Sequence, residues 1–362
     1  MEIVHIVGAR PNFMKAAPVM AALSRQGNSQ TLVHTGQHYD ANMSDVFFHQ
    51  LGMSQPDVNL GVGSGSHAVQ TAEVMVRLEK VLLERKPDWV VVYGDVNSTM
   101  AAALVCAKLR IRLAHVEAGL RSGDRSMPEE INRLVTDRIA DLLFTPSIDA
   151  NDNLLREGVT PDKIRLVGNV MIDTLARLLP LSLASAGHSN LSRWRDQRYA
   201  LVTLHRPSNV DDPTVLGEII KVLVELNTET PIVFPMHPRT RKQIERLTTP
   251  GATDKLHVVD PLGYMEFLAL QRQAALVITD SGGIQEETTF LGIPCLTVRE
   301  STERPITVTL GTNILVGRDA NRLRDEALRI LRGDAKKGTI PPLWDGRASV
   351  RIADILTLTG GS

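Results

Sequence analysis

The chain of 362 residues is 43% hydrophobic and 22% charged, a composition typical of a soluble globular protein. Its 40 basic and 41 acidic residues leave a formal net charge of -1, so no overall positive field would recruit nucleic acid or an anionic membrane. A chain of this length can bury one large core or two ordinary ones, and two domains are expected.

The cysteines and the N-terminus bear on where the protein works. Cys106 and Cys295 lie in apolar runs without metal-ligand spacing, so we expect reduced, buried thiols and no catalytic cysteine. The first residues, MEIVHIVGAR, carry no basic leader, and no apolar run reaches the roughly 18 residues of a membrane span. The sequence therefore predicts a cytoplasmic protein whose partners include neither nucleic acid nor a membrane.

Apolar runs with the length and β-branched content of buried strands alternate along the chain with segments of helical spacing. A less regular, serine-rich stretch at residues 178–198 separates two such series and predicts a domain boundary. This pattern predicts parallel sheets, and hence an α/β protein of two doubly wound domains with a ligand cleft between them. The expected strands are residues 3–7, 31–35, 89–93, 113–116, 142–145 and 164–167 in the first series, and 199–204, 232–235, 256–259, 276–279, 295–298 and 314–316 in the second.

Charged residues follow the strands of the first series. Arg10 follows the first expected strand, with Lys15 about one helical turn further on, and Asp95 and Glu117 follow the third and fourth strands. Glu129 opens the next helix, so the three carboxylates are expected at one edge of the sheet, where crowding suits general acid–base catalysis. Taken singly, each carboxylate could instead cap a helix or form an ion pair. Arg10 and Lys15 could simply neutralise these carboxylates.

The stretch TDSGGIQEETTFLG, residues 279–292, places Asp-Ser-Gly-Gly between an expected strand and a helix beginning at Ile284. A helix N-terminus exposes unpaired N–H groups, and Gly282 and Gly283 would let a phosphate approach them closely. Glu287 stands four residues after Gly283, on the same side of the helix. A carboxylate there can accept both hydroxyls of a ribose, and the combination favours a nucleotide.

Other residues of the second series have both a functional and a structural interpretation. Ser281 or Asp280 could merely cap the helix. His205 ends a strand and could be a core histidine bonded to the backbone, although its neighbour Arg206 favours a diphosphate contact. Phe267 could stack on a base, but core packing is its more frequent fate.

Three familiar signals are discounted. The glycine-rich residues 61–65 do not stand between a strand and a helix with dinucleotide-binding spacing, so we interpret them as a flexible loop. The chain has no Walker loop, which argues against ATP chemistry. His34 and His38 have no cysteine or carboxylate to complete a zinc set, so no metal is expected.

Eight segments stand in a characteristic order: GARPNFMKAAP, HTGQHYD, YGDVNSTMAAALVCAKLRIRLAHVEAGLRS, MPEEINR, GNVMID, TLHRPSN, DSGGIQEE and STERPITV. Through them the chain resembles the non-hydrolysing UDP-N-acetylglucosamine 2-epimerase family from Gly8 to about Gly317. The resemblance implies two Rossmann-like domains, residues 1–175 and 176–345, in the glycosyltransferase-B arrangement. It also implies a C-terminal helix, residues 346–362, that packs back on the first domain, and a homodimer.

The resemblance assigns roles to individual residues of this sequence. The family's catalytic positions correspond to Asp95, Glu117, Glu129 and His205. The family's substrate-binding positions correspond to Arg10, Lys15, Arg206, Leu262, Phe267, Ser281, Gly282, Gly283, Glu287 and Arg304. Among these, Leu262 and Phe267 are implied to lie near the uracil, Glu287 on the ribose, and residues 281–283 at the phosphates.

In the family's reaction a base removes the proton at C2 of the sugar while UDP leaves C1, and UDP then adds back with C2 inverted. The resemblance thus implies interconversion of UDP-N-acetylglucosamine and UDP-N-acetylmannosamine through a 2-acetamidoglucal. Neither a redox cofactor nor a metal is implied.

Two segments depart from many bacterial members of the family. Residues 37–43, QHYDANM, replace a QHREML segment linked to activation by a second substrate molecule, which argues against such activation here. The loop before Pro128 is shorter, which leaves the role of Glu129 open. Both segments are closer to the branch that includes archaeal enzymes and epimerases of diacetamido-uronic acid nucleotides.

Four functions therefore stay open, with epimerisation of UDP-N-acetylglucosamine first. The second is a 2-epimerase of UDP-2,3-diacetamido-glucuronic acid, or a hydrolysing epimerase that releases UDP and N-acetylmannosamine. The third is a UDP-sugar glycosyltransferase, which would need an acceptor pocket where the three carboxylates are expected. The fourth is a nucleotide-sugar sensor, which would not require those carboxylates.

Overall fold

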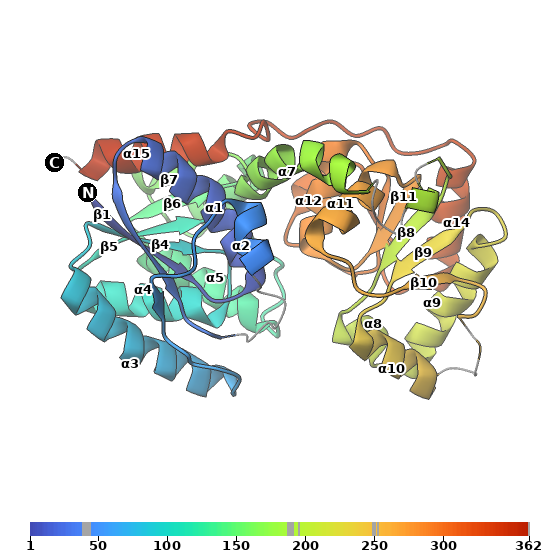
Figure 1. Cartoon of the computed structure of the whole chain (residues 1–362), viewed down its shortest axis with the longest axis horizontal. Coiled ribbons are helices and arrows are strands. Elements are labelled where there is room, and N and C mark those ends of the chain that lie inside the picture. The colour runs from blue at the N-terminus through green and yellow to red at the C-terminus, as the bar shows by residue number, and fades with distance from the viewer. Residues whose placement is uncertain (38–44, 187–191, 195, 248–250, 252, 361–362) are drawn as a thin grey trace. The chain divides into compact units, whose positions relative to one another are not determined.

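The structure is a computed structural model that describes residues 1–37, 45–186, 192–194, 196–247, 251 and 253–360. The chain forms two compact units, Met1–Leu175 with Pro342–Ser362, and Ala176–Pro341. The chain leaves the first unit within helix α7 (Val170–Ala186) and returns to it before the C-terminal helix α15 (Ala348–Gly360), as the colours of Figure 1 show.

The first unit contains a seven-stranded parallel sheet in the order β3-β2-β1-β4-β5-β6-β7. Helices α3 and α4 pack together on one face, and α1 and α15 pack together on the other (Figure 1). The strands are β1 (Glu2–Val7), β2 (Ser29–His34), β3 (Val58–Asn59), β4 (Trp89–Tyr93), β5 (Arg112–Val116), β6 (Leu142–Thr145) and β7 (Ile164–Leu166). The remaining helices are α1 (Arg10–Arg25), α2 (Asp45–Leu51), α3 (His67–Arg85), α4 (Asn97–Leu109), α5 (Pro128–Ile139) and α6 (Ile148–Arg156).

The second unit contains a six-stranded parallel sheet in the order β10-β9-β8-β11-β12-β13. Its strands are β8 (Ala200–Thr203), β9 (Ile232–Pro235), β10 (His257–Val259), β11 (Leu276–Thr279), β12 (Cys295–Thr297) and β13 (Asn313–Leu315). Its helices are α8 (Pro207–Val210), α9 (Pro213–Leu226), α10 (Pro238–Leu247), α11 (Tyr264–Gln273), α12 (Gly282–Leu291), α13 (Pro305–Thr309) and α14 (Ala320–Leu331).

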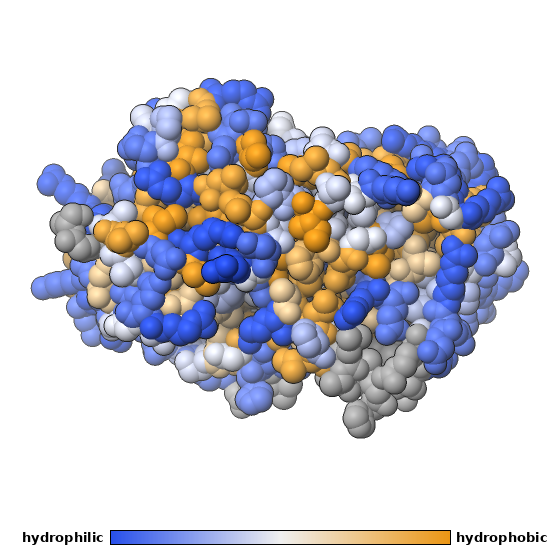
Figure 2. All heavy atoms as spheres, turned by 90° about the horizontal axis from the view of Figure 1, so that it is seen from above, coloured by the Kyte–Doolittle hydropathy of each residue, from blue (hydrophilic) through white to orange (hydrophobic). Residues whose placement is uncertain are grey.

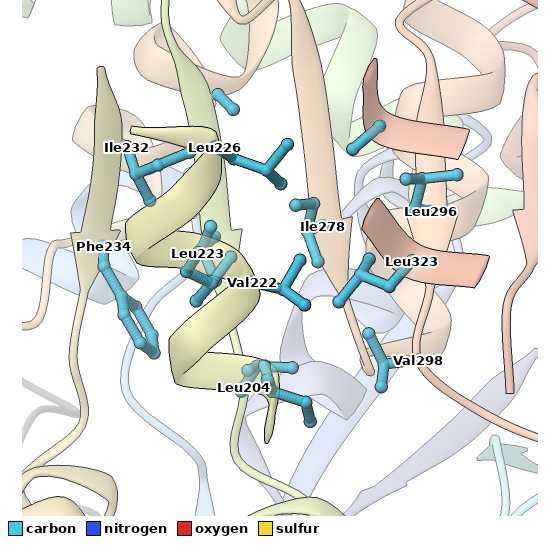
Figure 3. Close-up of a cluster of buried hydrophobic side chains, with 14 of the residues drawn as sticks. Leu204, Val222, Leu223, Leu226, Ile232, Phe234, Ile278, Leu296, Val298 and Leu323 are labelled. Atoms are coloured by element: carbon cyan, nitrogen blue, oxygen red, sulfur yellow. The ribbon is translucent and has the colours of Figure 1, made fainter. Parts of the chain in front are cut away.

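Each sheet is buried on both faces, which is why its strands read as continuous apolar runs. In the second unit, Leu223 of α9 and Leu323 of α14 pack onto Ile278 of β11 and its neighbours (Figure 3). The opposite face carries a second cluster around Trp194 and Tyr199, against which α11 and α12 pack. These two layers hold the strand ends, and the residues that follow them, in fixed positions.

The α/β class and the two doubly wound domains are confirmed. Every expected strand is present close to its expected bounds, and the short edge strand β3 was missed because two residues carry no periodic signal. The expectation of irregular structure from residue 178 was wrong, because α7 continues to Ala186 through Pro180. Buried Ile172, Leu175 and Leu178 form an apolar stripe at helical spacing that outweighs the lost N–H donor of the proline.

On the face drawn in Figure 2, hydrophobic side chains lie in small groups among hydrophilic ones. Single exposed residues such as Leu181 and Leu358 are ordinary on a protein surface and indicate no binding site by themselves. Every helix in the described part of the chain is too short or too polar to cross a membrane.

Candidate active site

Both sheets have one point at which the strand order reverses, between β1 and β4 in the first unit and between β8 and β11 in the second. Consecutive helices leave such a point on opposite faces, which opens a crevice beyond the carboxyl ends of the two strands. Most of the expected site residues stand directly after these strands or after β5. The topology therefore places two candidate sites, one in each unit.

In the first unit, Asn12 ties the two central strands together. Its Oδ1 accepts hydrogen bonds from the N–H groups of Gly8 (3.1 Å) and Ala9 (3.0 Å), and its Nδ2 donates to the carbonyl of Tyr93 (2.8 Å). The turn after β1 and the end of β4 are thereby fixed to each other. Helix α1 begins immediately after this turn, and Arg10 is its first residue.

Glu117 and Lys15 form an ion pair in which only 6% and 10% of the two side chains are exposed. Glu117 directly follows β5 and has a φ of 75°, a left-handed conformation that is strained for a residue with a side chain. Gly94 after β4 is also left-handed, and a Cβ on it would lie 2.9 Å from Lys15 Nζ. The neutralisation weighed for Lys15 is thus observed, and the chain holds Glu117 in a costly conformation in order to place it there.

Asp95 follows Gly94 and pairs with Arg133 of α5, while 33% of its side chain stays exposed. Arg133 is itself buried and makes a second ion pair with Glu130 (2.6 Å). The side-chain amide of Asn132 donates to the carbonyl of Asp95 (2.8 Å). Asp95 is therefore fixed through backbone and side chain, yet it remains accessible to a ligand.

A buried hydrogen-bond network stabilises the turns that follow β4 and β5. His115 Nε2 lies 2.8 Å from the carbonyl of Gly94, and its Nδ1 lies 2.6 Å from Asp137 Oδ1. Asp137 also pairs with Arg121 (2.7 Å) and accepts from the N–H of Gly119 (3.0 Å). Burial raises the pKa of Asp137, but His115 and Arg121 outweigh burial and hold it below its usual value. The network thus keeps a buried carboxylate ionised where it fixes the β4 and β5 turns.

Glu129 stands in the first turn of α5 and is half-buried. It belongs neither to the ion pair of Asp95 with Arg133 nor to that of Glu117 with Lys15. Asp95 and Glu117 thus follow adjacent strands, and Lys15 of α1 pairs with Glu117. Glu129 is a separate carboxylate on the neighbouring helix α5.

In the second unit, Asp280 bridges the two central strands. It is fully buried and accepts from the backbone N–H groups of His205 (3.1 Å) and Arg206 (2.9 Å) and from the side chain of Asn209 (3.1 Å). His205 Nδ1 lies 2.9 Å from Asp280 Oδ1, while 54% of the histidine side chain is exposed. Burial raises the pKa of Asp280, but His205 and these donors hold it below its usual value. His205 is therefore no core histidine, and Asp280 orients it.

Helix α12 begins two residues earlier than expected, at Gly282, and Ser281 makes no capping hydrogen bond through its side chain. The alternative that Ser281 only caps the helix is therefore wrong, and Asp280 is engaged with the β8 turn instead. A Cβ on Gly283 would meet nothing within 4 Å, whereas one on Gly282 would lie 2.5 Å from Arg304. The start of the helix is therefore open beside Gly283, and beside Gly282 it is lined by the guanidinium of Arg304 and the carboxylate of Glu303. Unpaired N–H groups at a helix end next to a guanidinium suit a phosphate.

Three arginines gather near this helix end. Burial lowers the pKa of Arg206, and the positive charges of Arg299 and Arg304 act in the same direction, while the carboxylates of Glu303 and Asp280 act against them. Arg299 pairs with Glu303 (2.7 Å), and Arg304 pairs with Glu303 and with Glu286 (2.8 Å). The two buried glutamates balance part of the positive charge and fix two of the arginines. Arg299 is not among the site residues that the sequence predicts.

Glu287 lies in the second turn of α12, where its Oε1 accepts a hydrogen bond from the hydroxyl of Tyr264 (2.9 Å). Burial raises the pKa of Glu287 from 4.5 to about 7, although the Tyr264 hydrogen bond acts in the opposite direction. Leu262 and Phe267, the other residues expected at a base, are partly buried and pack against the cluster of Trp194 and Tyr199. The packing interpretation of Phe267 thus holds in this structure.

The family model described as UDP-N-acetylglucosamine 2-epimerase matches residues 21–357. The chain belongs to the UDP-N-acetylglucosamine 2-epimerase family. A relative of that name from Methanocaldococcus jannaschii is 43% identical and aligns over 99% of each chain. The crystal structure of the Methanocaldococcus jannaschii UDP-GlcNAc 2-epimerase in complex with UDP-GlcNAc and UDP matches with a TM-score of 0.88 at 42% identity, over 99% of this chain and all of that one.

The UDP-N-acetylglucosamine 2-epimerase family includes relatives with different names. A Pseudomonas aeruginosa protein named UDP-2,3-diacetamido-2,3-dideoxy-D-glucuronate 2-epimerase is 44% identical, over 98% of this chain and 99% of that protein. Similarity to proteins of both names is equally strong, so family membership leaves the choice of sugar to the site itself.

The remaining predictions concern segments outside the two sites. The loop at residues 61–65 does lie between a strand, β3, and a helix, α3, but its glycines at 61, 63 and 65 lack the spacing of a dinucleotide-binding loop. Residues 37–43 depart from the family segment linked to activation, and of these, residues 38–43 lie outside the described residues. Cys106 and Cys295 are buried free thiols, as predicted, and burial raises their pKa values to about 12 and about 11. No group of His, Cys, Asp and Glu that could hold a metal occurs among the described residues.

Proposed function

We propose that this protein is a non-hydrolysing UDP-N-acetylglucosamine 2-epimerase that interconverts UDP-N-acetylglucosamine and UDP-N-acetylmannosamine. The observation that carries the proposal is that Asp95 and Glu117 follow adjacent strands of one unit, while an open, arginine-lined helix N-terminus stands at the same topological place in the other. Epimerisation needs acid–base groups and a diphosphate site acting on the same nucleotide sugar, and each unit provides one set.

In the proposed complex the UDP moiety binds the second unit. The phosphates accept from the N–H groups of residues 281–283 and are neutralised by Arg206 and Arg304. The ribose hydroxyls donate to Glu287, and the uracil lies near Leu262 and Phe267. Arg10 and Lys15 of the first unit are further proposed substrate contacts, as the family resemblance implies.

The proposed reaction begins when a carboxylate takes the C2 proton of the hexose. The electron pair of that C–H bond forms the C1–C2 double bond, and the C1–O bond breaks with its electrons leaving on UDP. A proton is then delivered to the opposite face of C2, and a UDP oxygen re-forms the bond to C1. Asp95, Glu117, Glu129 and His205 are the proposed proton donors and acceptors, and the cycle uses neither a redox cofactor nor a metal.

A second candidate substrate is UDP-2,3-diacetamido-glucuronic acid, because the Pseudomonas aeruginosa relative named for that sugar is 44% identical to this chain. The chemistry at C1 and C2 would be the same. The two sugars differ at C3 and C6, so the rates with each nucleotide sugar decide between them.

The test is to incubate the protein with each nucleotide sugar in heavy water and to follow the sugar by proton NMR. Deuterium at C2 of both epimers with UDP retained supports the proposal. Free UDP together with N-acetylmannosamine would instead indicate a hydrolysing enzyme. Absence of exchange with both sugars would leave a transferase or a sensor and would refute the proposal.

The proposal also includes a homodimer, as the resemblance implies, and a cytoplasmic location, as the sequence predicts. Sedimentation equilibrium of the purified protein tests the oligomeric state, with a mass near twice that of one chain as the expected result.

A further inference from the structure

A tyrosine stands at the carboxylate that we assign to the ribose. Tyr264 is the first residue of α11, and its hydroxyl donates to Glu287 Oε1 at 2.9 Å. Glu287 is 4% exposed, so its carboxylate is almost enclosed by protein atoms. A carboxylate oxygen has two lone pairs, so Oε1 can still accept from a ligand while Tyr264 holds it.

Both partners are fixed from behind. The N–H of Gly263 donates to the side chain of Glu266 (3.1 Å). This hydrogen bond caps the N-terminus of α11 and so fixes the position of Tyr264, the first residue of the helix. Glu287 projects from the second turn of α12, whose residues pack against β11 and β12. The hydroxyl and the carboxylate therefore meet through rigid helices, and the hydrogen bond selects one orientation of the carboxylate.

The hydrogen bond also favours the ionised form of Glu287. Burial and the charge of Glu286 raise the pKa of Glu287, the side chains of Tyr264 and Gln271 lower it, and the net result is a pKa of about 7. A protonated carboxyl would have one acceptor fewer for a diol. Removing the tyrosine hydroxyl would thus loosen the orientation of Glu287 and increase its protonated fraction near neutral pH.

We propose that Tyr264 is a positioning residue that holds Glu287 ready to accept two ribose hydroxyls and so sets the preference for a ribonucleotide over a 2′-deoxyribonucleotide. This inference rests on the proposed function, because it requires that the UDP moiety binds at α12. Tyr264 need not touch the nucleotide, since it acts through Glu287.

The test compares UDP and 2′-deoxy-UDP by isothermal titration calorimetry with wild type and Tyr264→Phe. Wild type should bind UDP more tightly than 2′-deoxy-UDP. Tyr264→Phe should weaken UDP binding by about 10-fold, as expected for a lost hydrogen bond to a charged group, and leave 2′-deoxy-UDP binding within about 3-fold of wild type. The ratio of the two affinities is the decisive readout, because a general loss of packing would weaken both ligands equally.

Tyr199→Phe is the matched control. Its hydroxyl is likewise buried in the second unit and donates to the carbonyl of Leu270 in α11 (2.6 Å), so its loss should leave the UDP to 2′-deoxy-UDP ratio unchanged. An unchanged ratio in Tyr264→Phe, or an equal change in Tyr199→Phe, would overturn the inference while leaving the proposed function intact. Failure of wild type to bind UDP at all would refute the proposed function and the inference with it.

Discussion

The two units place different chemistry at the same point of the same topology. In the first, Asp95 follows the central strand β4 and Glu117 follows its neighbour β5, and each carboxylate is held by a buried cation, Arg133 or Lys15. In the second, cations gather at the strand ends and are held by buried carboxylates such as Glu303. The reversal point of a doubly wound sheet thus supplies only a crevice, and the residues that follow the strands decide its chemistry.

This difference implies a division of labour. A variant in the carboxylate site of the first unit should impair the reaction and leave UDP binding unchanged. A variant at the α12 helix end should impair UDP binding first. Substitutions in each unit, and the pH dependence of binding, test that division.

Asp95→Asn should lower deuterium exchange at C2 by about 1,000-fold, because an amide cannot act as a general base. UDP affinity should stay within about 3-fold of wild type by calorimetry. Asp88→Asn is the control, because Asp88 precedes the same strand at its other end, where it accepts from the N–H of Glu2 (2.9 Å). Exchange that survives in Asp95→Asn would show that the base lies elsewhere.

His205→Gln should lower exchange by about 100-fold, because glutamine can donate a hydrogen bond but cannot transfer a proton. His205 belongs to the unit that we assign to nucleotide binding, so this variant is the sharpest challenge to the division of labour. A loss of UDP affinity as large as the loss of exchange would reassign His205 to binding. His257→Gln controls for the loss of an exposed histidine in the same unit.

Gly283→Ala should weaken UDP binding by about 10-fold or more, because the added methyl group would keep a phosphate from the helix N–H groups. The free protein should be as stable as wild type, or more stable by up to about 1 kcal/mol, because nothing lies within 4 Å of the new Cβ. Gly217→Ala in α9 is the matched control, with equally open space around its Cβ. Calorimetry and thermal melting separate the two effects, and unchanged UDP affinity in Gly283→Ala would argue against a phosphate there.

UDP affinity should increase as the pH rises through about 7, by at most about 10-fold per pH unit, because the ribose needs the ionised form of Glu287. Stability should respond in the opposite direction. The folded-state pKa lies above 4.5, so the stabilising contribution of the protonated group is complete below about pH 4.5 and is lost as the pH rises to about 7.

Glu287→Gln is the control for both pH effects. This variant should bind UDP weakly and retain only the pH dependence of the nucleotide phosphate, whose pKa is about 6. Its thermal stability should also lack the decline between pH 4.5 and 7. A UDP affinity profile equal to that of wild type would remove Glu287 from the ribose site.

The sequence by itself determined where the strands lie and which residues follow them. Strands buried on both faces must be continuously apolar, and parallel strands bring their carboxyl ends to one edge, so Asp95 and Glu117 could be placed together in advance. The helix N-terminus at residues 281–283 could also be predicted from the sequence, because two glycines directly after an apolar strand are a local signal for a phosphate-binding turn. The resemblance to the family implies roles for the same residues, Asp95, Glu117 and residues 281–283.

Only the tertiary structure decided how these residues are held. Lys15 and Glu117 are 102 residues apart, His5 and Tyr93 are 88 apart, and Tyr264 and Glu287 are 23 apart in different helices, so no local periodicity links them. In the sequence, Asp137 and Asn12 are indistinguishable from other polar residues of helices. In the folded chain, Asp137 contacts His115 and Asn12 donates to the carbonyl of Tyr93 at the end of β4. Local propensity and periodicity fix elements, but ionisation and orientation of a side chain depend on neighbours that only the folded chain assembles.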